Sequence, residues 1–130
     1  MLYLVLHTNK STKLGVKQLA DILNVPEPFL AKILQQLARN KLLSSTKGPH
    51  GGFYITEENA QNNICKVIEN IEGHPMFNKC FMGLEKCDES NPCPVHNSVV
   101  DFKEKLLKKF NDMTLAEFAK DINTQSTFLK

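Results

Sequence analysis

The fold of this chain is decided by residues 44–55, which read Ser44-Ser45-Thr46-Lys47-Gly48-Pro49-His50-Gly51-Gly52-Phe53-Tyr54-Ile55. Two short runs of strand-forming residues flank a dense cluster of glycine and proline, which is a strong signal for a tight turn. The stretch therefore predicts a two-stranded antiparallel hairpin whose tip carries Lys47 and His50.

Two amphipathic helices are predicted directly before this hairpin. The first is indicated by apolar residues at helical spacing, namely Val16, Leu19, Ala20 and Leu23. Asn24-Val25-Pro26 ends it, and the apolar residues of the next helix are Leu30, Ile33, Leu34 and Leu37. A short helix, a tight break and a second helix are typical of the helix-turn-helix, whose second helix enters the major groove of DNA. With the hairpin as its wing, the sequence predicts a mainly α winged helix-turn-helix.

The outward face of the second helix is the predicted DNA-contacting surface. Phe29 and Lys32 lie toward its N-terminal end, where base readout is concentrated, and Phe29 suits contact with a thymine methyl group. Farther along, Gln35, Gln36 and Arg39 suit contacts with the phosphate backbone. A plain solvated helix face is the alternative.

The wing favours the DNA interpretation over the solvated face. Lys47 stands on a tip too narrow to pack a core, and a cation in that position can enter a minor groove. His50, at the same turn, is a candidate for a phosphate contact, with simple exposure as its alternative.

An aperiodic segment, residues 73–93, holds three of the four cysteines. With a histidine just beyond, the pattern Cys-x6-Cys-x5-Cys-x2-His comprises Cys80, Cys87, Cys93 and His96. Three thiolates and one imidazole select zinc, copper or an iron–sulfur cluster. Structural zinc sites usually pair cysteines two to four residues apart, so the wider gaps favour a cluster, with zinc as the alternative. The fourth cysteine, Cys65, falls on an apolar helix and is interpreted as a buried structural thiol.

A long helix is predicted to start at Pro94, with Cys93 as its N-cap. The positive end of the helix dipole would then favour a thiolate at Cys93. Apolar residues recur along this helix at near-heptad spacing, at Val95, Val99, Phe102, Leu106 and Phe110. Thr114-Leu115-Ala116-Glu117 is a capping box that predicts a last short helix.

The composition of the chain limits the classes of protein to which it can belong. Apolar residues make up 42% of the 130-residue chain, enough for a packed core, whereas a net charge of +2 is too small to indicate nucleic-acid binding by itself. The longest apolar runs fall well short of the roughly 20 residues that span a bilayer, and the opening run is too short for a signal sequence. We therefore expect a cytoplasmic protein without membrane contact, with cysteines reduced and available to a metal.

Together these motifs resemble the Rrf-type bacterial transcriptional regulators, which include the IscR, NsrR and CymR kinds. The resemblance runs from about Leu2 to Phe118, and its most specific part is the Gly-Pro-x-Gly-Gly wing joined to the cysteine loop. It implies a homodimer, joined through the long helix, that binds a palindromic operator on double-stranded DNA. It also implies a cluster that senses iron–sulfur supply, nitric oxide or redox state.

Carried over by position, the resemblance gives candidate roles to individual residues. The cluster ligands would be Cys80, Cys87, Cys93 and His96, with a 2Fe–2S cluster favoured over 4Fe–4S and zinc as the alternative cofactor. Lys47 matches the minor-groove cation of the wing, and the recognition-helix contacts match Phe29, Ala31 and Lys32. A thiol enzyme is disfavoured, because the chain has no Cys-x-x-Cys motif and no evident catalytic base. A regulator that pairs with another protein instead of DNA is a further alternative.

Three departures from the family pattern matter. The first cysteine gap is longer by one residue, and Pro26 and Pro28 replace polar residues. The chain also starts inside the family's first helix, so we expect that helix to be truncated.

We divide the chain into a winged helix-turn-helix domain (1–72), a cysteine-rich cofactor loop (73–93), the dimerisation and short C-terminal helices (94–120) and a flexible tail (121–130).

Overall fold

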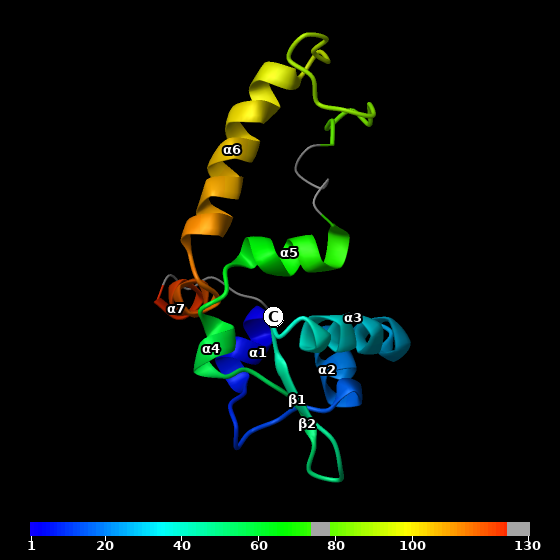
Figure 1. Cartoon of the computed structure of the whole chain (residues 1–130), viewed down its shortest axis with the longest axis vertical. Helices are drawn as coiled ribbons and strands as arrows, with labels where there is room; N and C mark the ends of the chain where they lie inside the picture. The colour runs from blue at the N-terminus through cyan, green and yellow to red at the C-terminus, as the bar shows by residue number, and fades with distance from the viewer. Residues whose placement is uncertain (74–78, 125–130) are drawn as a thin grey trace.

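The computed structural model describes residues 1–73 and 79–124 as a mostly helical chain with one two-stranded hairpin (Figure 1). The helices are α1 (Leu2–His7), α2 (Val16–Leu23), α3 (Glu27–Arg39), α4 (Glu57–Ala60), α5 (Ile64–Glu72), α6 (His96–Asp112) and α7 (Leu115–Thr124). The strands are β1 (Ser44–Thr46) and β2 (Gly52–Tyr54). The predicted fold class, mainly α with a hairpin wing, is confirmed.

The break between α2 and α3 follows from local chemistry. Asn24 ends α2 in the left-handed conformation (φ 53°), which asparagine tolerates better than most residues. Pro28 lies in the first turn of α3, where the missing N–H has no helical partner to lose. The two helices contact each other, and their buried residues are Leu19, Ala20, Leu30, Leu34 and Leu37.

The wing depends on two glycines that cannot carry a side chain. A Cβ on Gly51 would lie 2.3 Å from the Thr46 carbonyl oxygen, and one on Gly52 would lie 2.8 Å from the Leu14 carbonyl oxygen. Leu14 approaches this closely because it exchanges both backbone hydrogen bonds with Phe53, at 2.9 and 3.1 Å. The loop after α1 therefore braces the outer edge of β2 and fixes the base of the wing.

Two buried polar residues join segments that are distant in sequence. The Thr8 hydroxyl donates to the Leu4 carbonyl (2.6 Å) and accepts from the Ile55 N–H (3.1 Å), which ties α1 to the end of the wing. Asn59 donates to the Lys41 carbonyl, and its Oδ1 accepts from Ser44 and from the Thr56 N–H. Buried polar groups are tolerated when every donor and acceptor is paired in this way.

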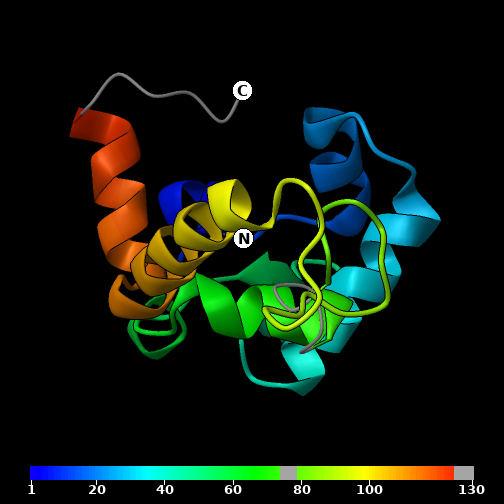
Figure 2. The same cartoon turned by 90° about the horizontal axis from the view of Figure 1, so that it is seen from above.

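The long helix α6 rises away from the winged head, and its C-terminal end is fixed to that head (Figure 1). The Leu115 N–H donates to the Asn62 carbonyl (2.8 Å), and the Asn63 amide donates to the Asn111 carbonyl (3.2 Å). Leu115 is 1% exposed and packs in the same buried cluster as Leu4. Seen from above, α7 and the α2–α3 pair lie on opposite sides of the head (Figure 2).

The predicted capping box at the start of α7 is present. The Glu117 carboxylate accepts from the Thr114 N–H (2.7 Å) and hydroxyl (2.9 Å), and the Thr114 hydroxyl accepts from the Glu117 N–H (3.2 Å). These hydrogen bonds, from the backbone first, lower the pKa of the Glu117 carboxyl below its ordinary value. The capping box therefore fixes the corner between α6 and α7.

Three boundaries differ from the sequence prediction. Helix α6 begins at His96, so Cys93 is not its N-cap but lies in the preceding turn, where its carbonyl accepts from the His96 N–H (2.9 Å). The short helix α4 was not predicted; Thr56 caps it by accepting from the Asn59 N–H. Helix α7 continues to Thr124, into the expected tail, and residues 125–130 of that tail lie outside the described residues.

In the described residues, every helix is too short or too polar to traverse a lipid bilayer.

We predict that Thr8→Val, which keeps the shape but removes the hydroxyl, lowers the free energy of unfolding by about 1–3 kcal/mol, because the Ile55 N–H is left buried without an acceptor. Urea unfolding of both proteins measures the change. The exposed Thr12 is a matched control, and Thr12→Val should change stability by less than about 0.5 kcal/mol. Equal effects of the two substitutions would contradict the proposed role of Thr8.

Candidate functional site

The exposed face of α3 carries most of the predicted DNA-contacting side chains. Phe29, in the first turn, is 61% exposed, which is unusual for a phenylalanine without a partner surface. The other exposed side chains of this face are Lys32, Gln35 and Arg39. Ala31 is half-buried beside them. This surface combines an apolar anchor with cations and an amide, the chemistry that reads base edges and phosphates.

Gln36 differs from the rest of this set. Its side-chain amide donates to the Asn70 carbonyl on α5, and the residue is half-buried. The amide therefore joins α3 to α5, and we leave Gln36 out of the proposed DNA surface. Its sequence position beside Gln35 gave no sign of this difference, because only the packing of α5 distinguishes the two.

The wing tip presents the two predicted DNA-contacting residues of the hairpin. Lys47 and His50 are both exposed, on the turn that projects from the head (Figure 1). Gly48 adopts a positive φ of 104° there, and a Cβ on it would meet no atom of the described residues within 4 Å, so no other part of the described chain packs against the tip at this residue. A narrow cationic tip is suited to a minor groove.

The four predicted cofactor ligands belong to the loop before α6 and to the first turn of that helix, a part of the chain that lies at the opposite end of the molecule from the wing (Figure 1). The Cys87 thiol lies 3.4 Å from Nδ1 of His96, in hydrogen-bond contact. The side chain of Cys80 interacts with that of Cys93. Cys80 and His96 are only 7% and 6% exposed, so His96 is not the surface histidine that was its alternative.

The surroundings of Cys80 favour its thiolate. Burial raises the pKa of this thiol, but the N–H groups of Met82 and Leu84, the Cys93 thiol and the Lys103 charge together lower that pKa below its ordinary value. Thiolates, not thiols, are the ligands of soft metals. The surroundings of Cys80 therefore favour the ionised form of its thiol, the form that soft metals bind.

Cys65 stands apart from this group. It is 2% exposed in α5, and burial, followed by the negative charge of Glu69, raises the pKa of its thiol. A buried neutral thiol is inert, which agrees with the structural role expected from the sequence.

An open hollow of about 360 Å³ adjoins the ligand residues on α6. Its lining residues are Cys87, Glu89, His96, Val100, Lys103, Glu104 and Leu107. Sequence reasoning missed Lys103, although its position seven residues after His96 indicated the same face of the helix.

The donor set fits a cofactor that takes soft ligands in two pairs. Within residues 1–73 and 79–124, no three histidine, cysteine or carboxylate side chains converge on a single point. The pairs Cys80–Cys93 and Cys87–His96 nevertheless lie on the same loop and helix end. A single zinc ion needs four ligands around one centre, whereas a two-iron cluster needs two at each iron.

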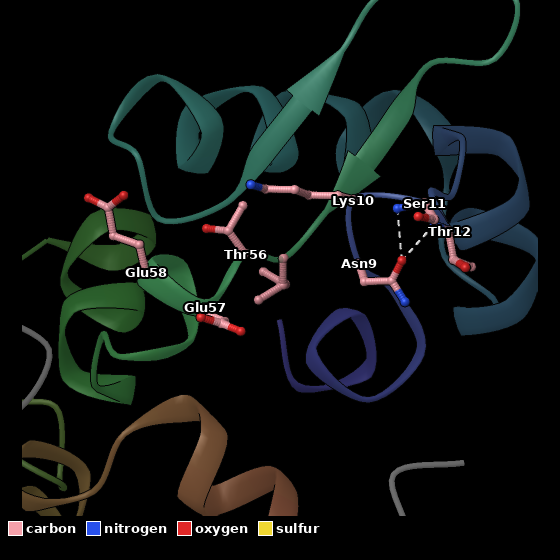
Figure 3. A pocket seen from close by; sticks show the side chains of 8 residues that line it. Asn9, Lys10, Ser11, Thr12, Thr56, Glu57 and Glu58 are labelled. Atoms are coloured by element: carbon pink, nitrogen blue, oxygen red, sulfur yellow. Dashed lines mark hydrogen bonds between the residues drawn. The ribbon is translucent and has the colours of Figure 1, made fainter.

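A second hollow, of about 720 Å³, lies on the head between the α1–α2 connection and the start of α4 (Figure 3). Asn9 Oδ1 accepts from the N–H groups of Ser11 and Thr12, and Thr56 caps α4, so these polar groups are used in local structure. The charged side chains around it, including Glu57 and Glu58, are exposed. We assign this hollow no chemistry.

Comparison with known proteins places this geometry in a family. The Rrf2 family model, described as an iron-dependent transcriptional regulator, matches residues 1–121. An HTH-type transcriptional regulator of Aquifex aeolicus is 31% identical over 117 residues, covering 88% of this chain and 80% of that protein. IscR of Yersinia pseudotuberculosis is 28% identical over 120 residues, covering 90% and 70%.

Solved structures share the fold. CymR of B. subtilis, a global cysteine regulator, superimposes with a TM-score of 0.68 at 17% identity, covering 92% of this chain and 86% of its own. IscR of T. potens gives a TM-score of 0.64 at 18% identity, covering 99% and 83%. The relatives are named as regulators, so the chain is a regulator and not an enzyme. The resemblance seen in the sequence is confirmed: this chain belongs to the Rrf2 family of transcriptional regulators.

Proposed function

We propose that this chain is a cytoplasmic, homodimeric DNA-binding regulator whose affinity for a palindromic operator is controlled by a 2Fe–2S cluster on Cys80, Cys87, Cys93 and His96. The observation that carries the proposal is the contact of the Cys87 thiol with the His96 ring at the start of α6, beside the loop that holds Cys80 and Cys93. The cluster would supply sensitivity to iron–sulfur supply, nitric oxide or redox state.

The residues around the candidate ligands support an iron–sulfur cluster more than a structural zinc site. Two separate pairs suit two irons, and replacing one thiolate by a neutral imidazole raises the reduction potential of such a cluster. The His96 ring is held by the Cys87 thiol and is buried, so its orientation is fixed before any metal arrives. IscR relatives support the same cofactor class.

The homodimer is supported by the exposed apolar residues of α6. Phe102 is 63% exposed in the middle of this helix, and a second copy of the same helix would cover it. It belongs to the near-heptad series that also includes Val95, Val99 and Leu106, all half-buried in the single chain. Two copies related by a two-fold axis would present two recognition helices to half-sites about 34 Å apart.

In the proposed switch, the cluster orders the loop before α6. Its loss or damage would let that loop relax, which would change the spacing of the two heads and hence operator affinity. The DNA surface of each head would comprise Phe29, Ala31, Lys32, Gln35, Arg39, Lys47 and His50.

We predict that protein made without oxygen is coloured and contains about two irons and two sulfides per chain. Replacing a ligand, as in Cys80→Ser or His96→Ala, should lower iron content and change the visible spectrum. Cys65→Ala is the matched control, because Cys65 is buried in α5 and is not one of the proposed ligands, and it should keep wild-type iron and sulfide. A colourless protein that holds one zinc and no sulfide would contradict cluster control and leave a structural zinc site.

We predict that Lys47→Ala weakens operator binding and reduces the slope of log affinity against log salt by about 1, because one phosphate-neutralising cation is lost. Fluorescence anisotropy on the protein's own promoter, titrated with salt, measures both quantities. Lys108→Ala, on the exposed surface of α6, is the control and should change neither. Unchanged affinity of Lys47→Ala would remove the wing from the interface.

A further inference from the structure

One face of α6 is directed toward the cysteine loop. His96, Val100, Lys103 and Leu107 follow one another at helical spacing and line the same hollow as Cys87. Lys103 is half-buried there, unlike Lys105 and Lys108, which are exposed on the same helix. A lysine that gives up solvent needs a partner for its ammonium group.

The partner of Lys103 is a backbone group of the loop. Its Nζ donates to the carbonyl of Lys79, 24 residues earlier and directly before Cys80. The bond joins the N-terminal end of the described loop to the second turn of α6. Because Lys79 directly precedes Cys80, the bond also places the ammonium charge next to the backbone that leads into Cys80.

The carboxylates near this ammonium do not form ion pairs with it in the described part of the chain. Glu89 and Glu104 line the same hollow, but in the described part of the chain neither lies within 4 Å of the Lys103 ammonium. The Lys103 ammonium is therefore held in no such ion pair, and it would attract a negatively charged group bound by Cys80, Cys87 and His96.

We propose that Lys103 is a positioning residue that fastens the first cysteine of the loop to α6 and sets a positive charge beside the cofactor. The inference rests on the proposed function for the identity of that cofactor. A cluster held by three thiolates and a neutral imidazole is anionic, and reduction adds one more negative charge. A fixed cation stabilises the reduced form more, so it raises the reduction potential.

The test compares the full-length wild-type protein with Lys103→Met, Lys103→Arg and the control Lys108→Met. Hydrogen exchange of residues 79–95 is measured in the metal-free protein, and the reduction potential is measured by spectroelectrochemistry after cluster reconstitution. Lys103→Met should exchange several-fold faster in this segment and have a more negative potential. Lys103→Arg should restore most of both properties, and Lys108→Met should match the wild type.

The two readouts separate this inference from the proposed function. Wild-type exchange and potential in Lys103→Met, with the cluster bound, would overturn the role of Lys103 and leave cluster control intact. Faster exchange in Lys103→Met, in a protein that never takes up iron and sulfide, would support the role of the Lys103–Lys79 bond in holding the loop and overturn the proposed cluster. An unchanged potential with faster exchange would overturn the electrostatic role alone.

Discussion

The contact between the Cys87 thiol and the His96 imidazole is the constraint on which the proposed site depends. The described part of the cysteine loop has no helix or strand of its own, so contacts made by side chains contribute to fixing where its thiols lie. The contact holds the loop against the first turn of α6. The bond of Lys103 to the Lys79 carbonyl holds the loop against the second turn of the same helix. Both anchors use side chains of α6, so the order of the loop and the position of this helix are physically linked.

The opposite end of α6 is equally constrained. Its 17 residues make a rod about 25 Å long, and the bonds of Asn62 and Asn63 to Leu115 and Asn111 join that rod to the winged head. Leu115, the first residue of α7, is also part of the buried cluster of the head, so the corner that follows α6 is anchored in the core of the head. In the proposed mechanism, a change at the loop therefore reaches the DNA-contacting surface through a rigid element, without any direct contact between the two sites.

Local signals explain what could be predicted from the sequence. The Asn24 break and the Thr114 capping box act within a few residues, and each is present where it was expected, as is the tight turn at the glycines of the wing. Tertiary contacts explain the rest. Gln36 turns to α5, and Lys103 reaches a carbonyl 24 residues away, which no periodicity encodes. The candidate ligands were predictable because cysteine in a polar loop has few other uses, but their arrangement in pairs required the folded helix end.

The central claim is that the loop cofactor governs how the two heads hold DNA. The most direct measurement is the operator Kd of a single anaerobic preparation, determined at one ionic strength before and after removal of the cluster with a chelator. The account predicts that the two values differ by at least about tenfold, or about 1.4 kcal/mol, and that reconstitution restores the first value. Equal affinities of the cluster-bound and cluster-free protein, both dimeric and folded, would contradict it.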